Sequence, residues 1–253
     1  MLIAQLTDFH VTVAGERVGG KIDTRAAFSA LMARVAALRP RPDLLLVSGD
    51  LTETGTEEEY AFVRAGLREL GIPFLAVPGN HDLRAPMRRG LAGHVGTEQD
   101  HLGLAVGFPG MRVIGLDTLV EGHGHGAIGP AQLTWLKGVL GGVDGEPALI
   151  FTHHPPFRTG IAAMDAIGVR EGAGELRTLL EGRSDILAIL SGHVHRAIGG
   201  IFAGHRAFIA PAAAHQFEFD PVGSGFRIVQ EPAQIALHTM VNGALMSYLV
   251  PGP

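Results

Sequence analysis

The sequence contains no cysteine among its 253 residues. This absence excludes disulfides, iron–sulfur clusters and thiolate-based zinc sites within the chain, because each of them needs cysteine sulfur. Any metal ion would have to be held by nitrogen and oxygen, so imidazole and carboxylate side chains are the ligands to look for.

The chain is also poor in positive charge. Its 20 Lys and Arg residues are outnumbered by 25 Asp and Glu residues, which gives a formal net charge of -5. Such a chain lacks the general basic field that grips a phosphate backbone, so we expect no long nucleic acid as a partner. A small charged substrate is still compatible with this charge.

Long apolar stretches are absent as well. No segment reaches the roughly 18 continuous apolar residues that a membrane span needs, and the start of the chain, MLIAQLTDFH, lacks the positive charge and long apolar centre of a secretory leader. We therefore expect a cytoplasmic protein without a membrane partner.

What the sequence does contain, with 46% hydrophobic residues, is a series of short apolar runs rich in Leu, Ile and Val. Runs of this length and composition are typical of strands buried inside a sheet. The predicted strands cover residues 2–6, 44–48, 74–77, 112–116, 148–152 and 186–190.

Helical patterns occupy several of the segments between these runs. Most of them combine a start signal with a stripe of apolar residues on one face. The stripes are Phe28, Leu31, Met32 and Val35 after an N-cap at Asp23 or Thr24; Tyr60, Val63, Leu67 and Leu70 after a capping box of Thr56 and Glu59; and Leu133, Leu136 and Leu140 after Pro130. A shorter helix is predicted over residues 174–182. Strands that alternate with helices predict a layered α/β domain.

The alternation of strand and helix patterns ends near residue 197. Short β-like pieces broken by Gly and Pro follow, at residues 197–202, 205–210, 225–230 and 245–250. We therefore predict a main domain of residues 1–197 and a β-rich segment of residues 198–253. The second segment is expected to complete the sheet, to form a cap, or to make a subunit contact.

Residues able to bind a metal follow one predicted strand after another. In an open α/β sheet the loops at the carboxyl ends of the strands gather along one rim, where ligands bind. Each residue alone could cap a helix, hold a turn or be a satisfied buried histidine. Together, without a cation, they would leave like charges and unpaired polar groups facing one another. The predicted metal centre draws on Asp8 and His10; Asp50; Asn80, His81 and Asp82; His153 and His154; and His193 and His195.

The last pair, in the stretch SGHVH, stands two residues apart, so an extended or turning chain could aim both imidazoles at one target. Amidohydrolases have an H-x-H near the start of a barrel, whereas this pair lies late in the chain. Metallo-β-lactamase-type folds continue H-x-H with an Asp and a further His, which GHVHRAIG lacks. Neither family therefore matches the order of motifs.

The ordered set DFH, GD, GNHD, THHPP and GHVH instead resembles the calcineurin-like metallophosphoesterases. The resemblance covers roughly the first 200 residues, with each motif at a predicted strand end. It is greatest to class III cyclic nucleotide phosphodiesterases and bacterial glycerophosphodiesterases, through the stretches GERVGGKIDTRAAF and HHPPFRTGIAAMDAIG.

This resemblance implies a four-layer αββα sandwich and a centre of two divalent metal ions. One ion would be bound by Asp8, His10, His195 and a shared Asp50, and the other by Asp50, Asn80, His153 and His193. Two cations about 4 Å apart lower the pKa of bound water and hold the attacking and leaving oxygens in line at phosphorus. Imidazole and carboxylate ligands suit Fe, Mn, Zn or Co, and the sequence does not choose among these metals.

The resemblance also implies roles for residues beside the ligands. His81 matches a family histidine that contacts the phosphate and protonates the leaving alkoxide, and Asp82 is a candidate to orient its ring. The alternative is that His81 merely packs beneath the site. His215 matches a position near the substrate. The H-x-P spacing makes His153 the ligand and leaves His154 a supporting or structural role.

Other polar residues have less specific patterns. His123 and His125 lie in a Gly-rich stretch and are expected in a solvated loop. Arg84, Arg88 and Arg89 could meet a phosphate, but a solvated helix face explains them at least as well.

We therefore expect an enzyme that hydrolyses small phosphodiesters, either a 3′,5′-cyclic nucleotide or a glycerophosphodiester, by attack of metal-bound hydroxide on phosphorus. Catalysis is assigned to His81 and Asp50, and substrate binding to Asn80, His81 and His215. Two alternatives stay open: a phosphomonoesterase or nuclease with the same site, and a non-catalytic metal-dependent binding protein. The resemblance further suggests a homo-oligomer, a dimer or larger, assembled through the segment after residue 197.

Overall fold

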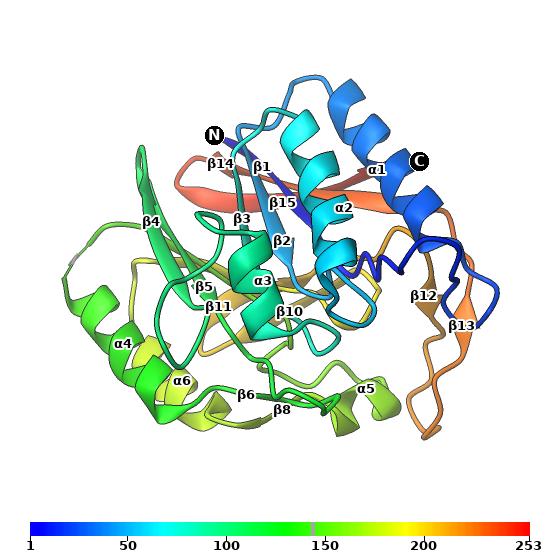
Figure 1. The fold of residues 1–253 in the computed structure, drawn as a ribbon. Coiled ribbons are helices and arrows are strands. Elements are labelled where there is room, and N and C mark those ends of the chain that lie inside the picture. The colour runs from blue at the N-terminus through cyan, green and yellow to red at the C-terminus, as the bar shows by residue number, and fades with distance from the viewer. Residues whose placement is uncertain (143–144) are drawn as a thin grey trace.

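Two β-sheets lie face to face, and helices cover the outer face of each sheet (Figure 1). The computed structural model describes residues 1–142 and 145–253. One outer layer consists of α1 (Thr24–Ala37), α2 (Glu57–Glu69) and α3 (Arg84–Gly90), and the other of α4 (Pro130–Gly141) and α6 (Ala173–Leu180). The predicted four-layer αββα sandwich is confirmed.

Both sheets are mixed. The first consists, in spatial order, of β15 (Ala244–Pro251), β14 (Gln234–Val241), β1 (Leu2–Leu6), β2 (Leu44–Ser48) and β3 (Phe74–Val77). The second consists of β10 (Ile198–Phe202), β11 (His205–Ile209), β9 (Ile186–Ser191), β7 (Ala148–Thr152), β5 (Met111–Leu116) and β4 (Leu104–Phe108). The strands β1, β2 and β3 run parallel, as do β5, β7 and β9, so their carboxyl ends meet at one edge of each sheet.

The strand β2 shows why such apolar runs form a buried sheet. All five of its residues are buried. Leu45 and Val47 pack with the helices outside, whereas Leu44 and Leu46 belong to the core between the two sheets. Successive side chains of a strand point to opposite faces. Because both faces are covered here, the position requires a continuous apolar run and no alternation with polar residues.

The helix starts follow the predicted signals. The Asp23 side chain accepts a hydrogen bond from the amide of Ala26 at the start of α1, and Thr56 and Glu59 form the reciprocal capping box of α2. Pro130 begins α4. The caps of α1 and α2 satisfy backbone amides of the first helical turn, which have no partner inside the helix. Of the helices in the described part of the chain, none combines the length and apolar character needed to cross a membrane.

The segment after residue 197 adds strands to both sheets. The strands β10 and β11 extend the second sheet beside β9, and the hairpin β14–β15 extends the first sheet beside β1. Between them, β12 (Gln216–Phe217) and β13 (Ile228–Val229) form a separate small hairpin. A boundary between two domains at residue 197 stays a prediction.

Several elements escape the sequence patterns, among them β4, β14 and α5 (Ala162–Ala166), and α3 is anticipated only through the solvated helix face considered for its arginines. The two helices have seven and five residues, and neither begins with a side-chain cap. Elements this short show too little periodicity to be recognised, because tertiary contacts stabilise them rather than local signals.

Candidate metal centre

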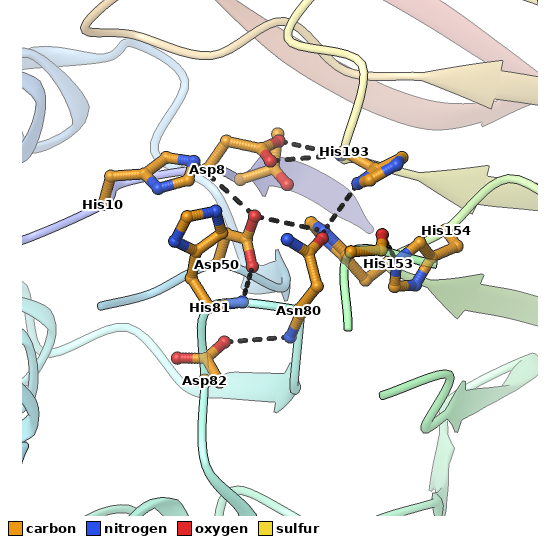
Figure 2. Close-up of polar contacts among 12 residues, drawn as sticks. Asp8, His10, Asp50, Asn80, His81, Asp82, His153, His154 and His193 are labelled. Carbon is orange, nitrogen blue, oxygen red and sulfur yellow. Dashed lines mark hydrogen bonds and ion pairs between the residues drawn. The ribbon is translucent and has the colours of Figure 1, made fainter. Parts of the chain in front are cut away.

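The predicted ligands come together where the strands of the two sheets end. Asp8 and His10 follow β1, Asp50 follows β2, Asn80 follows β3, His153 follows β7, and His193 and His195 follow β9. Figure 2 shows Asp50 near the middle of the group, with His10 on one side and Asn80 and His153 on the other. All of these side chains are buried except that of Asn80, which is half-buried.

Asp50 joins two sets of ligand atoms. Its Oδ2 atom lies 3.5 Å from His10 Nε2 and 3.3 Å from His153 Nε2. On the His10 side, His10 Nε2 is 3.1 Å from His195 Nε2, which in turn is 3.3 Å from Asp8 Oδ1. The geometry therefore brings together the four residues assigned to one ion.

The second set lies on the other side of Asp50. His153 Nε2 is 3.1 Å from Asn80 Oδ1 and 3.3 Å from His193 Nδ1. Asp50 is thus adjacent to both sets, as a bridging carboxylate has to be. Which atoms bind which ion stays a prediction.

Three of the imidazoles aim the same nitrogen at the centre because an acceptor behind the ring holds the other one. Nδ1 of His10 donates to the Glu53 carboxylate at 2.8 Å, Nδ1 of His153 to the Ser48 carbonyl at 2.8 Å, and Nδ1 of His195 to the His215 carbonyl at 3.1 Å. Their Nε2 atoms face one another and nearby carboxylates, and would offer lone pairs to a metal ion once it displaces the protons there. Metal-ligating histidines are held in this way. The residues therefore fit a divalent metal centre.

The buried carboxylates attract positive charge to the same place. Burial opposes a charged ring, but the hydrogen bond to Glu53 and the charge of Asp50 raise the pKa of His10 to about 9. Burial also opposes a charged ring at His153, but the charge of Asp50 outweighs this effect and raises the pKa of His153 to about 9. Burial also opposes ionisation of Asp50, yet the charges of His153 and His81 hold its pKa well below the usual value. The centre thus favours cations.

The backbone at the ligands has an uncommon conformation. Among the described residues seven non-glycine residues have a positive φ, and five of them are Asp8, His10, Asp50, His193 and His195. A positive φ at a non-glycine residue costs on the order of 1–3 kcal/mol, and the conformation persists only where the surrounding structure fixes it. The concentration of such residues at the predicted ligands is typical of a functional site.

Two glycines let the loops approach closely enough to form the centre. A Cβ atom on Gly79 would overlap the Asp50 carboxylate, and a Cβ on Gly49 would overlap the His153 ring. Gly49 also has a φ of 92°. Both positions therefore require the residue without a side chain.

His81 faces the pocket beside the centre. Its Nδ1 donates to the backbone carbonyl of Glu53 at 3.1 Å, and its backbone amide donates to Asp50 Oδ1 at 2.8 Å. The ring packs edge-on against His10, with centroids 4.6 Å apart. With Nδ1 held, Nε2 is the nitrogen available to a substrate.

Asp82 differs from its expected role. Its carboxylate accepts hydrogen bonds from the amides of Leu51 and Gly79, the Thr52 hydroxyl and the Tyr60 hydroxyl, and so ties the loop after β2 to the loop after β3. The expectation that it orients the His81 ring is not met, because the Glu53 carbonyl does this.

His154 and His215 lie against the predicted ligands. His154 is fully buried, with Nε2 donating to the Gly124 carbonyl and Nδ1 accepting from the Thr118 hydroxyl. Burial and the neighbouring His153 lower its pKa to about 3. The ring of His215 lies 4.6 Å from that of His195. Contact of His215 with a substrate stays a prediction.

The remaining candidates lie outside this group. Arg84 donates to both oxygens of Asp117, and Arg89 pairs with Glu57 on the surface. Neither arginine lines the pocket over the centre. His123 is exposed and His125 half-buried, both in a loop, as expected.

Glu53 is the functional residue that the sequence patterns missed. Its carboxylate holds His10, and its carbonyl holds His81. The only sequence signal is its place three residues after Asp50, and an acidic residue in a loop needs no special explanation. The direction of the His10 ring, which reveals this role, depends on the folded chain.

Comparison with known proteins shows the family of the chain. A family model described as calcineurin-like phosphoesterase matches residues 1–197. The chain belongs to this family. A relative from Arcobacter nitrofigilis, named as a probable glycerophosphodiester phosphodiesterase, is 32% identical to this phosphoesterase over 94% of the chain and 88% of the relative.

Two further matches broaden the comparison. A 3′,5′-cyclic-nucleotide phosphodiesterase of Nostoc sp. is 30% identical over 85% of this phosphoesterase and 79% of the relative. Among solved structures, a dimetal phosphatase of Danio rerio has a TM-score of 0.69 and 16% identity, with 98% of each chain covered. The structural match shows that the two chains share a fold.

Proposed function

We propose that this phosphoesterase hydrolyses small phosphodiesters at a centre of two divalent metal ions. The position of Asp50 carries the proposal, because its Oδ2 atom lies within 3.5 Å of His10 on one side and within 3.3 Å of His153 on the other. Asp8 and His195 complete the first set of ligands, and Asn80 and His193 complete the second. Fe, Mn, Zn or Co would suit these ligands.

The metal ions, when bound, lower the pKa of a bound water and stabilise negative charge on the phosphoryl oxygens. The side chains supply the rest. His10, His153 and His195 are fixed by acceptors behind their rings, so the centre is organised before a substrate arrives. His81, with Nδ1 held by a carbonyl, can place a proton from Nε2 on the leaving oxygen.

The pocket over the centre favours a diester over a monoester. It has a volume of about 140 Å³. Its polar lining consists of His10, Asp50, Asn80, His81, His193 and His195, and no Lys or Arg of the described residues lines it. A monoester carries a second negative charge that only the metal ions could neutralise, because no lysine or arginine of the described residues reaches it here. A phosphomonoesterase or nuclease therefore remains the second candidate, and a non-catalytic binding protein the third.

The names of the relatives suggest two substrate classes, glycerophosphodiesters and 3′,5′-cyclic nucleotides. We also propose that the protein acts in the cytoplasm as a homo-oligomer. Two exposed apolar side chains on the hairpin β14–β15, Val241 and Tyr248, lie on the same face of the sheet and support a subunit contact there.

The test compares the Asp50→Asn variant with the wild type on bis(p-nitrophenyl) phosphate and on p-nitrophenyl phosphate, after reconstitution with Mn²⁺. The wild type is expected to prefer the diester, and the variant to lose both metal and turnover. A variant that hydrolyses the diester at a near-normal rate would contradict the metal assignment. Faster hydrolysis of the monoester by the wild type would favour the second candidate.

A further inference from the structure

The pocket over the metal centre has two unlike walls. One is formed by the predicted ligands and His81, and the other is apolar. The apolar wall consists of Met164, Ile167, Phe217 and Phe226. It is built from α5 and its C-terminal end on one side and from the β12–β13 hairpin on the other. The metal ligands do not need such a wall, so it must serve another part of the substrate or the fold.

Two of these side chains lead outward from the centre. The ring of Phe217 lies 4.5 Å, centroid to centroid, from that of the ligand His195. The ring of Phe226 lies 5.5 Å from that of Phe217 at an angle of 53°. Phe217 also packs into a small core with Met164 and Ile161, whereas Phe226 is 52% exposed. An open aromatic face therefore stands at the mouth of the pocket.

Hydrogen bonds hold this wall at a fixed place relative to the ligands. Arg196, the residue after His195, donates to the Phe217 carbonyl at 2.7 Å and pairs with Glu231 on the far side of the hairpin. The Ala162 amide at the start of α5 donates to the Asp220 carbonyl at 3.1 Å. The two halves of the wall are thus tied to each other and to the β9 ligand loop.

We propose that Phe226, backed by Phe217, binds an aromatic ring carried by the phosphodiester, and so selects aryl or nucleobase-bearing diesters over diesters with only a short polar chain. The inference rests on the proposed function. A ring attached to a phosphorus at the centre would lie against Phe226 and opposite Met164 and Ile167. Aromatic pairs prefer such offset or edge contacts, and methionine sulfur also favours aromatic edges.

The test uses the Phe226→Ala variant of the metal-reconstituted enzyme, with Phe219→Ala as the matched control. Phe219 lies on the same hairpin, is 62% exposed and does not line the pocket. Each variant is compared with the wild type on bis(p-nitrophenyl) phosphate, which carries rings, and on glycerophosphoethanolamine, which carries none. Because variant and wild type are compared on the same substrate, the difference between the leaving groups of the two substrates does not enter the comparison.

We expect Phe226→Ala to lower kcat/KM for the aryl diester about fivefold to tenfold, mainly through KM, because an aromatic pair is worth that much beyond simple burial. The value for glycerophosphoethanolamine should change less than twofold, and Phe219→Ala should change neither. Titration calorimetry gives a readout without turnover: phenylphosphonate should bind the metal-reconstituted wild type more tightly than methylphosphonate, and Phe226→Ala should remove this preference. Phe226→Trp should retain it.

The outcomes separate the two proposals. If Phe226→Ala reduces both diesters equally, or neither, or if Phe219→Ala has the same effect, the role of Phe226 is wrong while the phosphodiesterase assignment stands. If the reconstituted wild type hydrolyses neither diester, the proposed function itself fails, and the inference fails with it.

Discussion

The Nε2 atoms of His10 and His195 lie 3.1 Å apart, although 185 residues separate these histidines in the sequence. Both rings donate an N–H from Nδ1 to an acceptor behind them, so their Nε2 atoms face each other across a buried space. Because the pKa of His10 is raised to about 9, its Nε2 carries a proton that His195 can accept, and a bound cation would replace this proton and bind both nitrogens. Because a metal ion would bind both nitrogens, we expect the free energy of unfolding to depend on bound metal.

The first prediction is that Mn²⁺ stabilises the protein and that this effect requires Asp50. At a metal concentration a hundred times Kd, binding adds about 2.7 kcal/mol to the free energy of unfolding. For a chain of this size, that raises Tm by roughly 5–10 °C. Thermal unfolding with and without Mn²⁺ checks this. Asp50→Asn should show little of the shift; an equal shift in the variant would place the metal elsewhere.

The second prediction concerns Glu53, whose carboxylate orients the His10 ring. Glu53→Ala should weaken metal binding about tenfold to a hundredfold, because the partners of metal-ligating histidines typically contribute that much. Glu53→Gln should lose less, since its amide oxygen can still accept from Nδ1. Metal titration by calorimetry measures the difference. Glu57→Ala, which removes an exposed partner of Arg89, is the control and should bind metal normally.

The third prediction separates proton donation by His81 from metal binding. His81→Ala should retain metal and lose about a hundredfold or more in turnover of glycerophosphoethanolamine, whose alkoxide leaving group needs a proton. The loss on bis(p-nitrophenyl) phosphate should be smaller, because p-nitrophenolate leaves readily without one. Equal losses on both substrates would contradict the role of His81 as an acid.

The fourth prediction is a pH dependence of metal binding. Despite burial, Glu53 and Asp50 raise the pKa of His10 to about 9, and Asp50 raises that of His153 to about 9. These values exceed the ordinary 6.5, so each group stabilises the metal-free fold fully below pH 6.5, and this contribution disappears as the pH rises through 9. A metal has to displace the same protons, so its affinity should rise over this window.

Unfolding measured at pH 6, 7, 8 and 9 with EDTA or with Mn²⁺ checks the fourth prediction. The stability of the EDTA-treated protein should fall across the series, and the additional stability from Mn²⁺ should grow. A metal effect that is constant with pH would mean that His10 and His153 are not the groups displaced.

The fifth prediction concerns His238, in the middle of β14 and outside the predicted ligand set. Its Nε2 donates to Gln5 and its Nδ1 accepts from Ser247, and burial lowers its pKa to about 4. The unfolded chain therefore takes up a proton that the folded chain excludes, and up to roughly 3 kcal/mol is lost as the pH falls from 6.5 to 4.

His238→Leu should flatten this slope of the free energy of unfolding against pH, whatever its effect on absolute stability. The exposed His123, replaced by Asn, provides the matched control for the loss of one histidine. An unchanged slope in His238→Leu would mean that the ring is already charged in the folded protein.

Much of the architecture follows from local patterns. The strand β2 is predictable because both of its faces are buried, and Asp50 is predictable because a carboxylate at such a strand end has a limited set of explanations. The resemblance to a family added the pairing of ligands into two sets. These features depend on residue types and their order, which the sequence displays directly.

The supporting residues could not be predicted in the same way. Glu53 acts through the direction of a ring 43 positions away. The sequence makes Asp82 a candidate to orient the His81 ring, but its carboxylate accepts hydrogen bonds from two loops and from Tyr60 on α2. Phe226 acquires its place only because the hairpin is tied to Arg196 and α5. Roles of this kind depend on orientation, which a linear pattern does not contain.

The left-handed backbone at Asp8, His10, Asp50, His193 and His195 limits how this centre could be transplanted. A designer who copied only the donor side chains onto another scaffold would find the rings pointing away, because ordinary strand or helix geometry cannot present them at these angles. The kinked turns would have to be moved together with the donors, along with the glycines that make room for them.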